Sequence, residues 1–140
     1  MANALIKKDF PTFLKYMHAN IIEMAGGKDR LLQRMDTVNA MASQFGASIK
    51  KILIGNPGNI VNYKNQLQVI LPQSSEMTSG FGSFSLETTL IGISSDGGKN
   101  WQFIDTSIYN LKEVKKAMPD LSPELKIPPP APPKLIPAQQ

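Results

Sequence analysis

The side chains best suited to acid–base chemistry are a histidine and a few tyrosine and aspartate residues. His18 is the only histidine, and Tyr16 and two acidic residues lie near it in the sequence. A histidine beside a carboxylate can act as a general base near neutral pH. A lone histidine at a helix end more often caps the helix or lies on the surface, and we favour that interpretation. Tyr63 and Asp105 are the remaining polar candidates, and no recognisable motif contains them.

Metal, thiol and cofactor chemistry find little support in the residue types present. The chain contains no cysteine, which excludes a thiol nucleophile, a disulfide and a thiolate metal site. One histidine leaves only carboxylates as further ligands, so we expect no metal site and no cofactor. Gly80-Phe81-Gly82 follows no strand-to-helix turn and is therefore not a phosphate loop. Without a nucleophile elbow or a dinucleotide fingerprint, we expect neither hydrolytic nor redox activity.

One short motif concerns a turn. Residues 94–101 match the Asp-box pattern Ser-x-Asp-x-Gly-x-x-Trp, with Asp96, Gly98 and Trp101 at the defining positions. Aspartate can bond backbone amides of its own turn, and glycine permits a positive φ. Sialidase-like propellers resemble this motif but repeat it in each blade, whereas this chain holds one copy. We predict a structural hairpin turn, and a sugar-handling role is the alternative.

Length, composition and charge restrict the class of protein. A chain of 140 residues with 41% hydrophobic and 19% charged residues is typical of one globular domain. The net charge is +4, but the lysines are scattered in pairs rather than gathered in a strip, so no nucleic-acid partner is expected. No apolar run reaches the roughly 18 residues that a membrane-spanning helix needs.

The N-terminal residues resemble the middle of a helix rather than a signal peptide, since they lack an apolar h-region. We expect a leader to precede residue 1, which favours an exported, periplasmic location over a cytoplasmic one.

The first third of the chain is predicted to be mainly helical. Asp9 is a predicted N-cap with Pro11 in the first turn of a helix that ends near residues 18–20. The apolar residues at 21–24 predict a short strand that Gly26–Gly27 terminates. Lys28–Phe45 is the clearest helix, and Gly46 is its predicted C′ residue. Its apolar stripe should pack on a sheet; the stripe consists of Leu31, Leu32, Met35, Val38, Ala42 and Phe45.

An antiparallel sheet is predicted to follow. Its strand-like segments are residues 49–54, 60–64, 67–71, 84–93 and 101–104. Residues 72–82 are polar and glycine-rich, which predicts a long, mobile loop. Short connections favour antiparallel neighbours.

The C-terminal segment has a different composition. We divide the chain into an α+β domain over residues 1–110 and a proline-rich tail over residues 111–140, with a short helix at 111–118. Eight of the eleven prolines lie between residues 119 and 137, so this stretch cannot form a helix or a central strand. Residues 129–134 have the PxxPxK spacing that polyproline-binding modules recognise. A spacer or a strap over the domain is the interpretation we favour.

This order of elements resembles the nuclear transport factor 2-like (SnoaL-like, ketosteroid-isomerase-like) superfamily. Residues 8–27 resemble the opening of the family, Lys28–Phe45 its third helix, and residues 94–104 its last hairpin. The resemblance covers residues 2–105. It implies a bacterial member with a cone-shaped α+β fold, in which N-terminal helices pack on a strongly curved antiparallel sheet.

The resemblance also implies an apolar pocket between the helices and the concave face of the sheet. The expected lining is Phe13, Tyr16, Met17, Met35, Val38, Trp101 and Phe103, with His18, Tyr63 and Asp105 as polar candidates. The abundant methionines suit either core packing or an adaptable cavity. No residue matches the catalytic groups of the family's enzymes.

The sequence leaves three hypotheses for the function of the protein. We favour a non-catalytic domain that binds a small apolar molecule or a partner, forming a homodimer through the exposed face of its sheet. The alternatives are an isomerase- or dehydratase-type enzyme and a protein-interaction module that uses the proline-rich tail.

Overall fold

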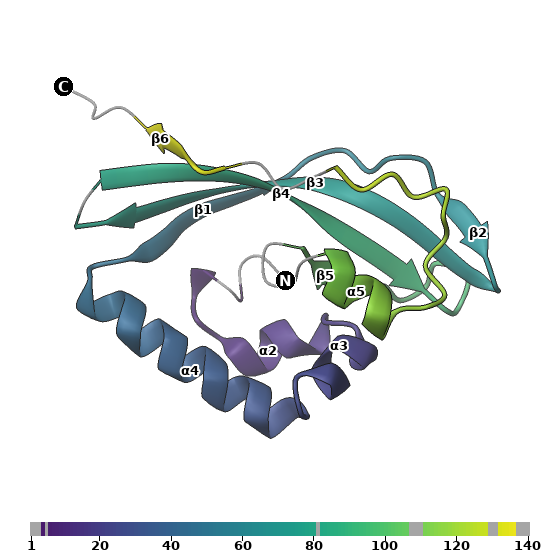
Figure 1. Cartoon of the computed structure of the whole chain (residues 1–140), viewed down its shortest axis with the longest axis horizontal. Coiled ribbons are helices and arrows are strands. Elements are labelled where there is room, and N and C mark those ends of the chain that lie inside the picture. The colour runs from purple at the N-terminus through teal and green to yellow at the C-terminus, as the bar shows by residue number, and fades with distance from the viewer. Residues whose placement is uncertain (1–3, 5, 81, 107–110, 129–131, 137–140) are drawn as a thin grey trace.

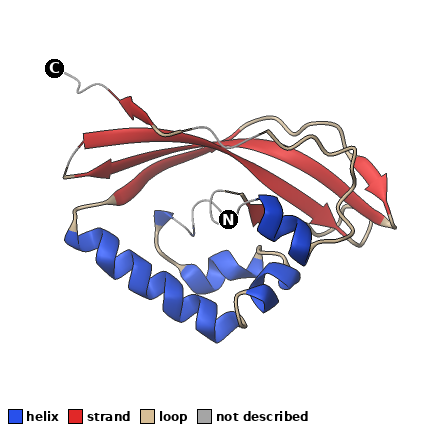
Figure 2. Cartoon of the chain, viewed as in Figure 1, coloured by secondary structure: helices blue, strands red, loops and turns tan. Residues whose placement is uncertain are grey.

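The computed structural model describes residues 4, 6–80, 82–106, 111–128 and 132–136 (Figure 1). Its elements in chain order are α2 (Phe10–Lys15), α3 (Ala19–Met24), α4 (Lys28–Gln44), β1 (Ser48–Ile54), β2 (Val61–Tyr63), β3 (Gln66–Ser79), β4 (Gly82–Ser94), β5 (Gln102–Asp105), α5 (Leu111–Ala117) and β6 (Lys134–Ile136). Over the described ranges the strands form one six-stranded antiparallel sheet. Figure 2 shows the helices gathered on one side of this sheet. The predicted α+β class is confirmed.

The N-terminal helices follow from local capping. Asp9 accepts a hydrogen bond from the Thr12 amide (3.4 Å) and caps α2, as predicted. The predicted strand at residues 21–24 is wrong, because these residues form α3. His18 caps α3, and Ile21 turns its β-branched side chain into the core. This burial outweighs the weak strand preference of isoleucine.

The hydrophobic core lies between the short helices and the middle of the sheet. Phe13 and Met17 meet Ile91 and Ile104 there. Met17 also forms an isolated bridge to Phe103, which ties the connection between α2 and α3 to β5. The helices are thus held on the sheet by both side chains and backbone.

Helix α4 has the predicted length and ending. Gly46 has a φ of 70°, and the Ala47 amide bonds the Ala42 carbonyl (2.9 Å) in a Schellman closure. Packing of the whole apolar stripe on the sheet is not observed. Leu31 is buried, but Val38 and Phe45 are 59% and 63% exposed. The helix packs on α2 and α3, which lie between its first half and the sheet (Figure 1).

The loop predicted at residues 72–82 is instead strand over residues 72–79 and from Gly82, with Gly80 in a turn. Strand β3 continues to Ser79 and pairs with β4 as far as Ser79 opposite Gly82. Residue 81 lies outside the described residues. Strand β3 is paired with β1 on its other side, and the Pro72 carbonyl accepts from the Gly55 amide (2.8 Å). Pairing on both sides stabilises a segment whose polar composition disfavours it.

The C-terminal segment joins the same core. The predicted helix at 111–118 is present as α5, and Val114 and Met118 are buried among the residues of the N-terminal helices. Strand β6 pairs with the start of β4 through Ser83–Ser85. The tail therefore forms an edge strand, which proline-rich sequence permits. Residues 129–131 of the PxxPxK motif lie outside the described ranges.

Candidate functional site

The Asp-box turn is held together by its own side chains. Asp96 Oδ1 accepts from Ser94 Oγ and from the Asn100 amide, both at 2.9 Å, and Asp96 Oδ2 accepts from Asn100 Nδ2 at 2.8 Å. The bond from the Asn100 amide, aided by the two side-chain bonds, lowers the pKa of Asp96 to about 2. The turn joins the paired strands β4 and β5, as predicted, and Trp101 is half-buried with its Nε1 on the Gly98 carbonyl (3.1 Å). These bonds favour a structural role.

His18 acts as a helix cap. Its Nδ1 accepts from the Asn20 amide at 3.1 Å, and its own amide bonds the Phe103 carbonyl at 3.0 Å. The side chain is buried, and burial lowers its pKa. The imidazole is therefore held in its neutral form, which an acceptor at Nδ1 requires.

The other polar candidates lie apart from one another. Asp105 is buried on β5 and accepts from Gln73 Nε2 at 3.2 Å. Tyr63 lies on β2, with the Lys64 ammonium 5.6 Å from its ring centre. Tyr16 is exposed at the end of α2. None of these residues, nor His18, lines the pocket described next.

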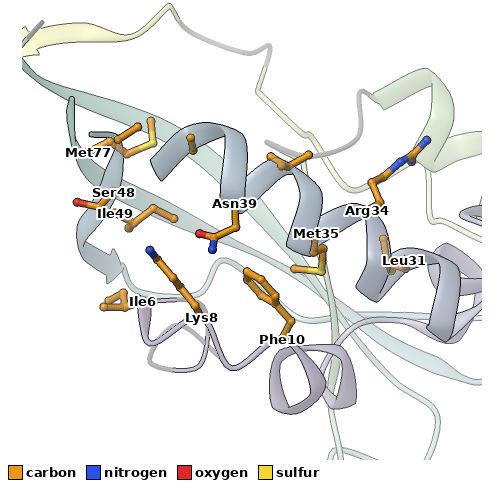
Figure 3. A pocket seen from close by; sticks show the side chains of 13 residues that line it. Ile6, Lys8, Phe10, Leu31, Arg34, Met35, Asn39, Ser48, Ile49 and Met77 are labelled. Carbon is orange, nitrogen blue, oxygen red and sulfur yellow. The ribbon is translucent and has the colours of Figure 1, made fainter. Parts of the chain in front are cut away.

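A pocket of about 490 Å³ lies between α4, the N-terminal segment and the start of β1. Ile6, Lys8 and Phe10 come from the N-terminal segment, and Ala47, Ser48, Ile49 and Met77 come from the sheet and the turn before it. Helix α4 contributes Leu31, Arg34, Met35, Val38, Asn39 and Ala42 (Figure 3). Spacings of three, four and seven residues place these side chains on one face of the helix.

Of the residues predicted to line a pocket, Met35 and Val38 line this one. Phe13 and Met17 are buried in the core, Trp101 directly precedes β5, and Phe103 lies on β5. The short helices α2 and α5 fill the space beneath β5 with core side chains. The pocket lies along α4, beside the N-terminal segment and β1.

Lys8 reaches the pocket from an unusual backbone position. Its φ is 61°, and the Asp9 amide bonds the Ala4 carbonyl at 2.8 Å. This bond closes the first helical turn in the way a left-handed C′ residue closes a helix, a place that glycine usually fills. A lysine there costs about 1–2 kcal/mol relative to an unstrained conformation. The sequence presents Lys8 as one of a scattered lysine pair, so no pattern identified it as a site residue.

The described residues contain no group of three or more histidine, cysteine, aspartate or glutamate side chains arranged to hold a metal ion. Among the helices of the described ranges, none is long and apolar enough to cross a membrane.

The fold and the pocket define an α+β protein with an apolar cavity between a long helix and the end of an antiparallel sheet. No family model, characterised protein or solved structure matches the chain.

Proposed function

We propose that this protein is a non-catalytic domain that binds a small apolar molecule in the pocket between α4 and β1. The observation that carries the proposal is a cavity of about 490 Å³. Pockets for small molecules measure roughly 300–1,000 Å³ and are mostly apolar. Met35 of α4 and Met77 of β3 both line the pocket, and methionine adapts its shape to different ligands.

Membership of the nuclear transport factor 2-like superfamily, with its cone-shaped fold, is part of the same proposal. The order of helices before an antiparallel sheet supports it. Helix α3 is a departure, since it lies where the resemblance implies a short strand.

An isomerase or dehydratase remains the second hypothesis. Such an enzyme needs two convergent polar groups in its pocket. Because His18, Tyr63 and Asp105 do not line this pocket, we rank binding above catalysis. The hypothesis of a tail that recruits partners ranks third, because β6 is already paired with β4.

We also propose a homodimer through the sheet. Leu53 and Ile54 of β1 are exposed large apolar side chains that a second copy would cover. Sedimentation that shows a monomer at high micromolar concentration would contradict the dimer.

The binding proposal can be tested with two alanines of one helix. Ala42 lines the pocket, whereas Ala40 is exposed on α4 and does not. Titration with the neutral fluorophore N-phenyl-1-naphthylamine should saturate at one molecule per chain. We expect Ala42→Trp to fill the cavity and weaken binding at least tenfold, about 1.4 kcal/mol.

Ala40→Trp is the matched control and should bind like the unchanged protein. Absence of saturable binding, or equal binding by the two tryptophan variants, would refute the proposal.

A further inference from the structure

The pocket contains cationic side chains among walls that are mostly apolar. Lys8 and Arg34 both contribute to the lining, and no carboxylate does among the described residues. In Figure 3 the Lys8 ammonium points toward Asn39 and Ser48, and the Arg34 side chain points away from them. Lys8 is exposed overall, and its ammonium is directed toward a mostly apolar cavity, beside an amide that can donate hydrogen bonds.

Lys8 also differs from the other left-handed lysine. Lys64 has a φ of 49°, and its ammonium forms an ion pair with Asp120 at 3.0 Å. Within the described ranges, the Lys8 ammonium forms no such ion pair. Lys8 occupies a strained backbone position that glycine would fill without strain, and its ammonium points toward the cavity. Strained backbone positions of this kind cluster at functional sites.

We propose that the ligand is an amphiphile with a carboxylate head and an apolar tail, of the fatty-acid type. The carboxylate binds the Lys8 ammonium and the Asn39 amide, and the tail lies along Phe10 and Met35. This inference rests on the proposed binding function. A neutral head would give the Lys8 ammonium no counter-charge, and a cationic head would be repelled by Lys8 and Arg34.

The test compares ligands that share one tail. Dodecanoate, dodecan-1-ol and dodecyltrimethylammonium, each below its micelle concentration, compete with N-phenyl-1-naphthylamine at low salt and pH 8. We expect dodecanoate to displace the fluorophore at least tenfold more effectively than the alcohol, and the cation to be weakest. The preference for dodecanoate should shrink in high salt, which screens the attraction.

Two variants connect the preference to Lys8. Lys8→Gly should remove the preference for dodecanoate over the alcohol while leaving thermal stability equal or higher, because glycine relieves the left-handed strain. Unfolding therefore cannot explain the loss. Lys7→Gln removes an exposed neighbouring charge that does not line the pocket, and it should retain the preference.

The outcomes separate the two proposals. If the fluorophore binds but acid and alcohol compete equally, or if Lys8→Gly keeps the preference, the carboxylate assignment is refuted and the binding pocket stands. If the fluorophore does not bind at all, the proposed function fails and the carboxylate assignment fails with it.

Discussion

Gln68 and Ser122 are joined by a hydrogen bond that anchors the C-terminal segment to the sheet. The Ser122 amide donates to Gln68 Oε1 at 2.8 Å, and Gln68 Nε2 donates to the Asp120 carbonyl at 2.9 Å. The Gln68 side chain is fully buried, at 0% exposure. One side-chain amide therefore replaces the two backbone partners that this non-helical segment lacks.

Gln68→Leu should destabilise the fold, because it leaves the Ser122 amide and the Asp120 carbonyl without these partners. We expect a loss of about 1–3 kcal/mol in the free energy of unfolding, measured by urea denaturation. Gln102→Leu is the control, since Gln102 is an exposed glutamine on β5. Equal stability of the two variants would contradict this role for Gln68.

Asp96 should make stability depend on acid pH. Its pKa in the folded state is about 2, against an ordinary value of 3.8, so folding favours the charged form. The stabilisation is present above about pH 4 and is lost as pH falls through about 2. Asp96→Asn keeps an acceptor but cannot titrate in this range.

Thermal melting at pH 5, 3.5 and 2 tests the pH dependence predicted for Asp96. The difference in melting temperature between the unchanged protein and Asp96→Asn should be largest at pH 5 and should narrow toward pH 2. A difference that stays constant over this range would show that the charge of Asp96 does not matter.

His18 should make stability depend on pH in the same direction as Asp96, but over a higher pH range. Burial lowers its pKa below the ordinary 6.5, so the unfolded chain binds a proton more readily than the folded one. The stabilisation is complete above pH 6.5 and declines as pH falls toward the lowered pKa.

Two substitutions separate the cap from the charge. His18→Ala should cost about 1 kcal/mol at pH 8, because the Asn20 amide loses its acceptor. His18→Asn can still cap the helix but should lose the dependence of stability on pH between 7 and 5. A pH dependence unchanged in both variants would assign it to other groups.

The division between domain and tail can be tested by truncation. Removal of residues 129–140 deletes β6, whose Leu135 is 66% exposed, so the melting temperature should change little. Removal of residues 111–140 also deletes Val114 and Met118 from the core. That shorter chain should lose its cooperative transition in calorimetry, since deleting even one buried methionine side chain costs about 2–5 kcal/mol. A cooperative fold for residues 1–110 would support a separate tail.

The sequence alone determined the features whose interactions are local. The Asp9 cap reaches Thr12, the Gly46 closure reaches Ala42, and Asp96 bonds atoms within its own hairpin. Each of these needs only a few neighbouring residues and their intrinsic conformational preferences. Such features are recognisable in a sequence because the partners are a few residues apart.

Only the tertiary structure decided the elements whose partners are distant. Residues 72–79 are strand because β1 and β4 pair with them on both sides, although their own composition predicts a loop. Ile21 is helical because its side chain enters the core that β4, β5 and α5 share. The pocket lies on the Lys8 side of α4, whereas side chains of α5 and α2 fill the space beneath β5. Non-local packing and pairing determine which spaces are filled, and they override propensities of about 1 kcal/mol or less per residue.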